Sequence, residues 1–261
     1  MKIGLIAGSG FYNIDWLGEA EELTISTPYG EPSDKYFKYS YGEHEIYFLP
    51  RHGLKHDKAP HSINYRANIH GFKELGVERI IAFTATGGIN GNFAPGDIVI
   101  TDNAIDFTSG RASTYFDNDE IYHVDLTSPF CPDTRKKLLH AAKKADVKVH
   151  KAGVYVCTNG PRYETAAEIM AYKILGADMV GMTIFPECTL ARELQICYAS
   201  VSVITNYAAG VSNEPLDTDH VTKIMAKSNN KLKDIFKKYL KLDTEIKCGC
   251  HSSLEGNKIS K

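Results

Sequence analysis

Lys2-Ile3-Gly4-Leu5-Ile6-Ala7 is a short apolar run that ends in the small residues Gly8-Ser9-Gly10. A second run of the same kind, Arg79-Ile80-Ile81-Ala82-Phe83-Thr84, leads towards Gly87-Gly88. Short apolar runs that stop at glycine are typical of strands that are buried in a sheet and followed by tight loops. The sequence therefore predicts a fold organised around buried strands.

Helical patterns lie between several of the strands. We expect further strands over residues 45–49, 97–101, 153–157, 179–183 and 197–205, and helices over 64–75, 132–144 and 165–175. The clearest helix is the last, where apolar residues recur at helical spacing from Val221 to Leu240 and Asp217 can cap the start. Alternating strands and helices predict an α/β fold with a central mixed sheet covered by helices on both faces. In such sheets, ligands bind at strand ends.

Composition excludes several classes of protein. The chain has 261 residues, of which 43% are hydrophobic and 24% charged, which suits a single globular domain without a linker. The formal charge of -2 and the pI near 6.6 leave no broad basic surface, so we expect no nucleic-acid partner. Apolar runs are too short for a secretory signal or a membrane span, and we expect a cytoplasmic protein without a membrane partner.

The six cysteines predict no metal site from their spacing. Cys131, Cys157, Cys188 and Cys197 fall in predicted packed elements and are expected to behave as small buried hydrophobes. Cys248-Gly249-Cys250 suits either a redox pair or half of a metal site, but no second close Cys or Cys-His pair completes a zinc spacing.

Three loops have the composition of anion-binding segments. Gly8-Ser9-Gly10 offers backbone N–H groups and a hydroxyl, although a simple tight turn has the same composition. Asn13 stands where a dinucleotide fingerprint needs a third glycine, so NAD binding is disfavoured. Arg51-His52-Gly53-Leu54-Lys55-His56 suits an anion clamp or a solvated loop. Thr84-Ala85-Thr86-Gly87-Gly88 is either a strand-end donor loop or a turn.

Taken together, these segments resemble the trimeric purine nucleoside phosphorylase and methylthioadenosine phosphorylase family. The resemblance runs from Ile3 to about Leu240 and keeps the order of Gly8-Ser9-Gly10, Arg51-His52-Gly53, Asn64-Tyr65-Arg66-Ala67-Asn68, Pro95-Gly96-Asp97-Ile98-Val99, Gly160-Pro161-Arg162, Gly181-Met182-Thr183 and Pro186-Glu187. It implies a phosphorylase/hydrolase-like single domain. We therefore expect a nucleoside phosphorylase domain over residues 1–243 and a loosely held C-terminal tail over residues 244–261.

The resemblance also implies roles for individual residues. Orthophosphate would be held by Ser9, Arg51, His52, Thr84, Ala85 and Thr183. Met182 would lie along the ribose, Tyr163 would pack on the base, and Asn206-Tyr207-Ala208 would form the base-binding stretch. His123 matches a position that reaches the 5′ end of the sugar in a neighbouring subunit.

Glu164 and Asn206 point to the 6-oxopurine branch of that family. The methylthioadenosine enzymes have a serine where Glu164 stands and Asp-x-Asp where Asn206-Tyr207-Ala208 stands. A carboxylate only accepts hydrogen bonds, whereas an amide both donates and accepts, so the pair suits N1–H, O6 and N7 of hypoxanthine or guanine. A mismatched base would leave buried groups unpaired at about 1–3 kcal/mol each.

The 5′ side of the substrate stays open at this point. His220 lies fourteen positions after Asn206, like the histidine that contacts the 5′-hydroxyl in inosine phosphorylases, whereas an alignment on Val221 puts an apolar residue there. Asn206-Tyr207-Ala208-Ala209-Gly210 and Thr108-Ser109-Gly110-Arg111 also resemble a subgroup that acts on methylthioinosine. Inosine, guanosine and methylthioinosine all remain candidate substrates.

The predicted activity is that of a pentosyltransferase, a 6-oxopurine nucleoside phosphorylase of purine salvage. Asn206 would stabilise negative charge that develops on the departing base, and orthophosphate would be a co-substrate, with no metal or organic cofactor. The resemblance implies a homotrimer or a homohexamer. The alternatives are a methylthioadenosine phosphorylase of the same family and, in another class, a nucleotide-binding module without phosphorolysis.

Overall fold

The computed structural model describes residues 1–8, 11, 14–117, 120–213, 216–242 and 245–259. In chain order, the strands are β1 (Lys2–Ala7), β2 (Glu21–Leu23), β3 (Tyr36–Tyr41), β4 (His44–Pro50), β5 (Arg79–Gly88), β6 (Ile98–Ile100), β7 (Asn103–Asp106), β8 (Val154–Cys157), β9 (Met179–Gly181) and β10 (Cys197–Tyr207). The α-helices are α1 (Tyr65–Glu74), α2 (Pro132–Lys144), α3 (Ala166–Ile174), α4 (Ile184–Glu193) and α5 (Thr218–Tyr239). Short 3-10 helices are η1 (Asp15–Leu17), η2 (Pro60–Ser62) and η3 (Cys250–Ser252).

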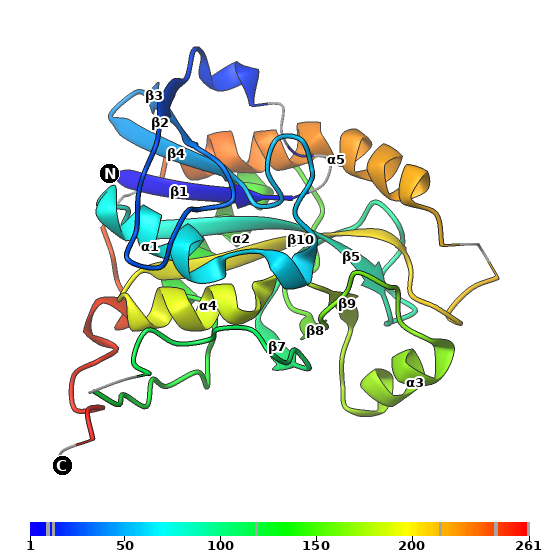
Figure 1. Ribbon diagram of the computed structural model, residues 1–261. Coiled ribbons are helices and arrows are strands. Elements are labelled where there is room, and N and C mark those ends of the chain that lie inside the picture. The colour runs from blue at the N-terminus through cyan, green and yellow to red at the C-terminus, as the bar shows by residue number, and fades with distance from the viewer. Residues whose placement is uncertain (9–10, 12–13, 118–119, 214–215, 243–244, 260–261) are drawn as a thin grey trace.

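One mixed sheet forms the centre of the molecule (Figure 1). β1 lies between β4 and β5 and is parallel to both, and β10 runs parallel to β5 along almost its whole length. The C-terminal end of β5 pairs with β9 in antiparallel orientation. β8 and β7 follow β9 in the sheet. The described strands thus form a single sheet, as the alternation of strands and helices in the sequence predicts.

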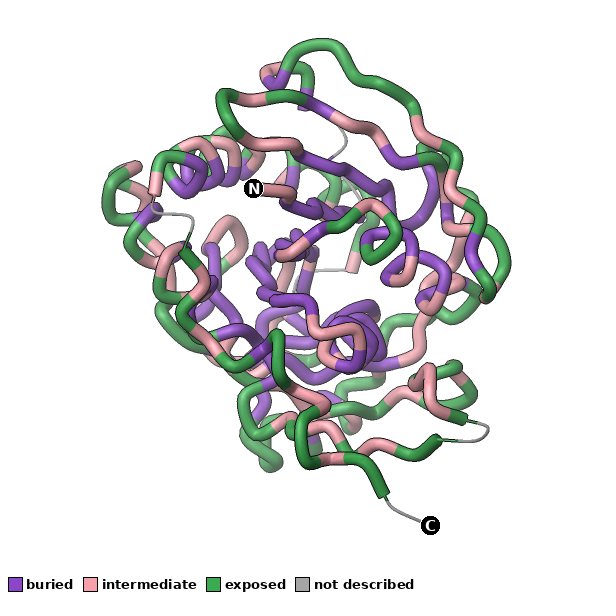
Figure 2. The backbone as a smooth tube through the Cα atoms, turned by 90° about the vertical axis from the view of Figure 1, so that its left-hand side faces the viewer, coloured by how far each residue is buried: buried purple, intermediate pink, exposed green. Residues whose placement is uncertain are grey.

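Helices cover both faces of this sheet because the buried strands are apolar on both sides. On one face, Leu5 of β1 and Val201 of β10 belong to a core cluster with residues of α2 and α5. On the other face, Ile6 and Ile204 belong to a cluster with residues of α1 and α4. Figure 2 shows the buried segments gathered in the interior of the molecule.

Most of the expected elements form where the sequence places them, and the differences have local causes. The strand expected over residues 79–84 extends to Gly88, and the one expected over 197–205 extends to Tyr207. The sequence did not predict the short strands β2 and β7, the strand β3 or the helix α4. β3 has a mixed aromatic and polar sequence without a continuous apolar run and lies between β2 and β4. α4 contains Phe185 in an extended conformation before Pro186, so its sequence does not indicate a regular helix.

The C-terminal segment is held by specific contacts and is not the loose tail that its composition suggests. Ser253 donates a hydrogen bond to the carbonyl of Arg192, and Ile259 donates its N–H to the carbonyl of Ile121. Cys250 is 2% exposed. The expected boundary between residues 243 and 244 lies outside the described residues and stays a prediction. Within the described residues, the helices lack the combination of length and hydropathy needed to cross a membrane.

Candidate active site

A cavity of about 440 Å³ lies where several strands of the central sheet end. Gly8 follows β1, Arg51 follows β4, and Asn206 lies near the end of β10, so the carboxyl ends of neighbouring parallel strands meet here. This is where open α/β sheets bind ligands, and the volume suits a small molecule. Ten of the predicted site residues line the cavity: Arg51, His52, Thr84, Ala85, Tyr163, Glu164, Met182, Thr183, Asn206 and Ala208.

Arg51 supplies a fixed cation at the cavity wall. Its side chain is 1% exposed and forms a two-point ion pair with Glu187, in which Nε donates to Oε1 at 2.5 Å and Nη2 donates to Oε2 at 3.0 Å. Nη1 donates to the carbonyl of Phe83 at 3.2 Å. Although burial opposes the charge, the Glu187 carboxylate raises the pKa of Arg51 above its usual value. Arg51 is therefore charged and locked in one orientation.

His52 is a neutral hydrogen-bond acceptor towards the cavity. Its Nδ1 lies 2.8 Å from the carbonyl of Lys58, and a carbonyl only accepts, so the ring proton is on Nδ1. Burial, assisted by the charge of Arg51, lowers the pKa of His52 to about 4. Nε2 is therefore unprotonated at neutral pH. A Cβ on Gly8 would lie 3.1 Å from this ring, so glycine leaves room for a ligand to approach it.

Small hydroxyl side chains complete this end of the cavity. Thr84 is 2% exposed, and its Oγ1 lies 2.9 Å from Oγ of Ser202. Thr183 follows β9, and its N–H lies 3.5 Å from the hydroxyl of Tyr155. Ala85 lies between Thr84 and Thr86 on the same wall. Together with Arg51 and His52, these residues form a compact group of cationic, donor and acceptor atoms that suits an oxyanion.

Glu164 and Asn206 also line the cavity, and neighbouring hydroxyls orient both. Thr158 donates to Oε1 of Glu164 at 2.7 Å. Thr205 donates to Oδ1 of Asn206 at 2.9 Å, and Nδ2 of Asn206 donates to the carbonyl of Tyr207 at 2.8 Å. A carboxylate has a second oxygen and an amide nitrogen has a second N–H. Each side chain therefore keeps hydrogen-bonding capacity for a ligand.

Met182 is positioned by the close approach of a loop. Gly160 has φ +60°, and a Cβ there would lie 2.4 Å from Sδ of Met182. Only glycine adopts this conformation easily and also leaves room for the thioether. Tyr163, from the same loop, is 39% exposed and lines the cavity.

Four predicted site residues are not among the described residues that line the cavity. Ser9 lies outside the described residues. Tyr207 is half-buried beside Asn206 but does not line this cavity. His123 is exposed, and its N–H donates to the carbonyl of Asn257. His220 is exposed and lies off the lining, whereas Val221, the alternative position, lines the cavity with Leu216. The roles of all four stay predictions.

A family model described as the phosphorylase superfamily matches residues 2–241.

The chain belongs to the phosphorylase superfamily.

Among curated relatives, the chain is 48% identical over 266 residues to a 6-oxopurine nucleoside phosphorylase of Pyrococcus furiosus, with 98% of each chain covered. It is 47% identical over 257 residues to a probable S-methyl-5′-thioinosine phosphorylase of Thermodesulfovibrio yellowstonii, which covers 98% of this chain and 96% of that one. Among solved structures, a methylthioadenosine phosphorylase from an antarctic soil metagenomic library matches with a TM-score of 0.92 at 33% identity, covering 99% of this chain and 92% of that one.

In this member of the phosphorylase superfamily, two supporting residues were missed by reasoning from the sequence. Glu187 holds Arg51 and also accepts a hydrogen bond from the hydroxyl of Tyr198 at 2.7 Å, and Thr158 orients Glu164. A glutamate beside Pro186 inside an apolar stretch was the available signal for Glu187, because an acidic residue is rarely buried without a partner. Thr158 gives no such signal.

Proposed function

We propose that the protein is a 6-oxopurine nucleoside phosphorylase, which cleaves the glycosidic bond of inosine, guanosine or methylthioinosine with orthophosphate. The observation that carries the proposal is the placement of Glu164 and Asn206 in one cavity with Arg51. A group of residues that suits an oxyanion and a pair that suits a purine edge line one cavity, which suits a reaction between phosphate and a nucleoside. The products are the free base and ribose 1-phosphate or its methylthio analogue.

The oxyanion end binds and orients the nucleophile. Arg51 provides a positive charge that Glu187 keeps in place, and the Thr84 and Thr183 hydroxyls provide further polar contacts. Orthophosphate near neutral pH still carries at least one P–OH group, and the unprotonated Nε2 of His52 accepts from it. Ser9, which follows β1 in the sequence, is proposed as an additional donor. Holding phosphate beside the sugar converts a bimolecular encounter into an internal reaction.

Glu164 and Asn206 recognise the base and stabilise it as a leaving group. The free oxygen of Glu164 accepts N1–H of a 6-oxopurine, and the second N–H of Asn206 donates to N7 or O6. Adenine has no N1–H, so it leaves the carboxylate unmatched. Tyr163 and Ala208 provide the packing surface for the base, and Met182 lies along the ribose.

Bond making and bond breaking are balanced in this arrangement. A phosphate oxygen forms a bond to C1′ while the bond from C1′ to N9 breaks, and the electron pair of that bond leaves on the purine. The purine anion then takes up a proton from solvent and becomes the neutral free base. The sugar gains positive character, which the phosphate charge stabilises, and the purine gains negative charge, which strengthens its hydrogen bond with Asn206. Asn206 is therefore proposed as the catalytic residue. The protein supplies no covalent nucleophile in this scheme.

The apolar wall formed by Leu216 and Val221 favours methylthioinosine among the three substrates. These two residues line the cavity and the neighbouring His220 does not, which supports an apolar 5′ substituent over a hydroxyl. Burying a methyl or methylene group is worth about 0.8 kcal/mol. The methylthioinosine relative from Thermodesulfovibrio yellowstonii is consistent with this assignment.

A parallel substrate panel tests the proposal. Inosine, guanosine, methylthioinosine, adenosine and methylthioadenosine are supplied with and without orthophosphate, and release of free base is measured. We expect release from the three 6-oxopurine nucleosides only, and only with orthophosphate. Glu164→Ala should lose most of this activity, whereas Glu74→Ala, on an exposed position of α1, should retain it.

The other outcomes of the panel identify the alternatives. Preference for methylthioadenosine would identify a methylthioadenosine phosphorylase. Binding of nucleoside without phosphate-dependent release of base would identify a binding module. We further propose that the enzyme acts in purine salvage in the cytoplasm as a homotrimer or homohexamer, with His123 reaching a neighbouring subunit, and mass measurement in solution tests the assembly.

A further inference from the structure

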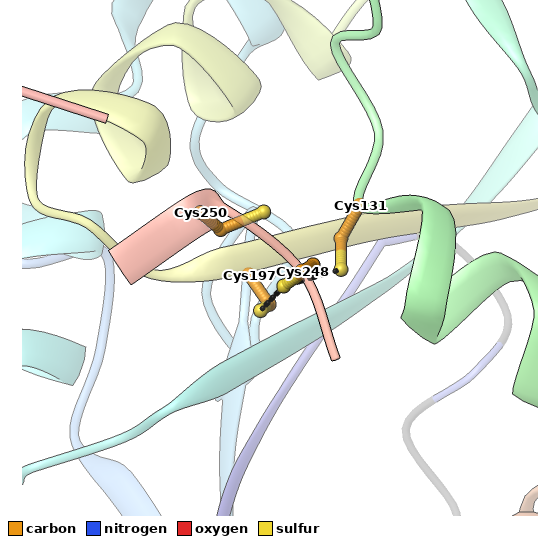
Figure 3. Close-up of side chains that lie close together, drawn as sticks. All are labelled: Cys131, Cys197, Cys248 and Cys250. Carbon is orange, nitrogen blue, oxygen red and sulfur yellow. Dashed lines mark hydrogen bonds between the residues drawn. The ribbon is translucent and has the colours of Figure 1, made fainter. Parts of the chain in front are cut away.

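Four cysteines from three distant parts of the chain come together at one point (Figure 3). Cys131 immediately precedes α2, Cys197 begins β10, and Cys248 and Cys250 belong to the segment after α5. All four Sγ atoms lie within 4.8 Å of one another. The sequence has no second close cysteine pair to complete a metal site with Cys248 and Cys250. In the folded chain, Cys131 and Cys197 take that place.

The spacing of the sulfur atoms suits a tetrahedral metal ion. Sγ of Cys248 lies 3.5 Å from Sγ of Cys131 and 3.4 Å from Sγ of Cys197. A Zn–S bond of about 2.3 Å in a regular tetrahedron places the sulfur atoms about 3.8 Å apart. Cys248 is almost equally distant from two different cysteines, and Cys250 completes the group within 4.8 Å.

The start of α2 favours a thiolate at Cys131, although burial of the cluster opposes charge on a sulfur atom without a metal. Cys131 and Cys197 are fully buried, and Cys131 is the N-cap of α2, where the N–H of Thr134 donates to its Sγ at 3.4 Å. Helix N-termini and N–H donors stabilise thiolates. Nε2 of His251 lies 3.7 Å from Sγ of Cys197.

Two cations lie near enough to act on the cluster. Arg79 interacts electrostatically with Cys197, and Arg192 interacts with Cys250. A dication held by four thiolates leaves a negatively charged site, which these arginines partly neutralise. None of the four cysteines lines the candidate active-site cavity.

We propose that Cys131, Cys197, Cys248 and Cys250 bind one zinc ion. Four thiolates fill the coordination of zinc and leave no position for water or substrate, so the site is structural and takes no part in phosphorolysis. Zinc replaces the thiol protons, which pass to solvent. The ion joins the C-terminal segment to the start of α2 and the start of β10.

Metal content and spectroscopy of the intact chain test the site. The protein is purified without added metal or chelator, and zinc is measured per chain by elemental analysis. We expect about one equivalent of zinc. Replacement by Co²⁺ should give the intense visible and charge-transfer bands of a tetrahedral thiolate complex. These two measurements need no substitution, so they remain decisive if a cysteine variant fails to fold.

Matched variants locate the ion. The double variant Cys248→Ser, Cys250→Ser should lose the zinc and the cobalt bands, whereas Cys188→Ala, at a buried cysteine of α4 outside the cluster, should keep both. After chelation and denaturation without reductant, all six cysteines should react with an alkylating reagent. A chain without zinc or cobalt bands, a chain with the four thiols blocked in disulfides, or zinc retained by the double variant would overturn the proposal.

Discussion

Glu187 holds Arg51 through both carboxylate oxygens, at 2.5 Å and 3.0 Å, although the two residues lie far apart in the chain. The second oxygen also accepts the hydroxyl of Tyr198 at 2.7 Å. The pair links the end of β4 to α4 and β10 beneath the cavity. Because both charges are almost completely buried, neither is tolerated without the other.

Glu187→Gln should therefore weaken both the fold and phosphate binding. Removing one partner of a buried ion pair costs about 3–5 kcal/mol in the free energy of unfolding. The unpaired guanidinium would also reorient and raise the KM for phosphate. Urea unfolding at fixed protein concentration and phosphate-dependent kinetics measure the two effects.

The control for this variant is an exposed ion pair. Lys35 lies 2.8 Å from Glu22, and both side chains are more than half exposed. Glu22→Gln should change the free energy of unfolding by less than about 0.5 kcal/mol. Equal stability and equal phosphate KM in wild type and Glu187→Gln would contradict the structural role of the buried pair.

His52 should make stability depend on pH in the acidic range. Its pKa is lowered to about 4 in the folded chain, whereas a histidine in the unfolded chain titrates near about 6.5. Between these values the unfolded state binds the proton and the folded state does not, so stability is complete above about pH 6.5 and falls as the pH decreases towards 4. Unfolding free energies measured across this window should have a positive slope with pH.

A variant separates this effect from other acidic titrations. His52→Asn keeps a side-chain N–H near the carbonyl of Lys58 but cannot titrate. Its stability should fall less steeply in the same window. Orthophosphate should also flatten the wild-type slope, because a bound anion favours protonation of the imidazole. Identical slopes for wild type and variant would show that His52 does not carry the effect.

Asn206→Asp should move base preference towards 6-aminopurines. A carboxylate accepts from the amino group of adenine, but it cannot donate to O6 or N7 of hypoxanthine. One unmatched buried group costs about 1–3 kcal/mol, so kcat/KM for inosine should fall about tenfold or more relative to adenosine. Asn92→Asp, on an exposed loop, is the control. Unchanged selectivity in Asn206→Asp would reject the assigned contact with the base.

Val221→Thr should reduce preference for the methylthio substrate. The substitution preserves shape but places a hydroxyl on an apolar wall of the cavity, and the ratio of kcat/KM for methylthioinosine to that for inosine should fall roughly threefold or more. His220→Ala should leave this ratio unchanged, because that side chain is exposed. If His220→Ala instead impairs inosine selectively, the histidine contacts the 5′-hydroxyl and the apolar assignment fails.

The sequence predicts the parts of the fold that depend on local patterns. β1, β5 and β10 are continuous apolar runs, and α5 has apolar residues at helical spacing, so each is recognisable alone. α4 was missed because Pro186 and the extended Phe185 interrupt its first turn, and the helix is stabilised by packing against the sheet. Its existence depends on tertiary contacts that no local pattern records.

The candidate site also contains residues that the sequence predicts and residues that only the folded structure reveals. Arg51, Glu164 and Asn206 were found because their chemistry suits a ligand and their motifs resemble a known family, and the structure brings them to one cavity. Glu187 and Thr158 act on those residues through contacts between distant segments. The cysteine cluster is the extreme case, because its members are uninformative until the chain is folded.

The C-terminal segment lies directly beside the segment that carries His123. Lys258 pairs with Tyr122, and the carbonyl of Asn257 accepts the N–H of His123. Affinity tags and fluorescent fusions attached after this segment would therefore disturb its contacts with the segment of His123. That histidine is expected to contribute to the active site of a neighbouring subunit. Turnover measured on tagged preparations should be compared with that of the enzyme after the tag is removed, and crosslinking or immobilisation chemistry is better directed to another face.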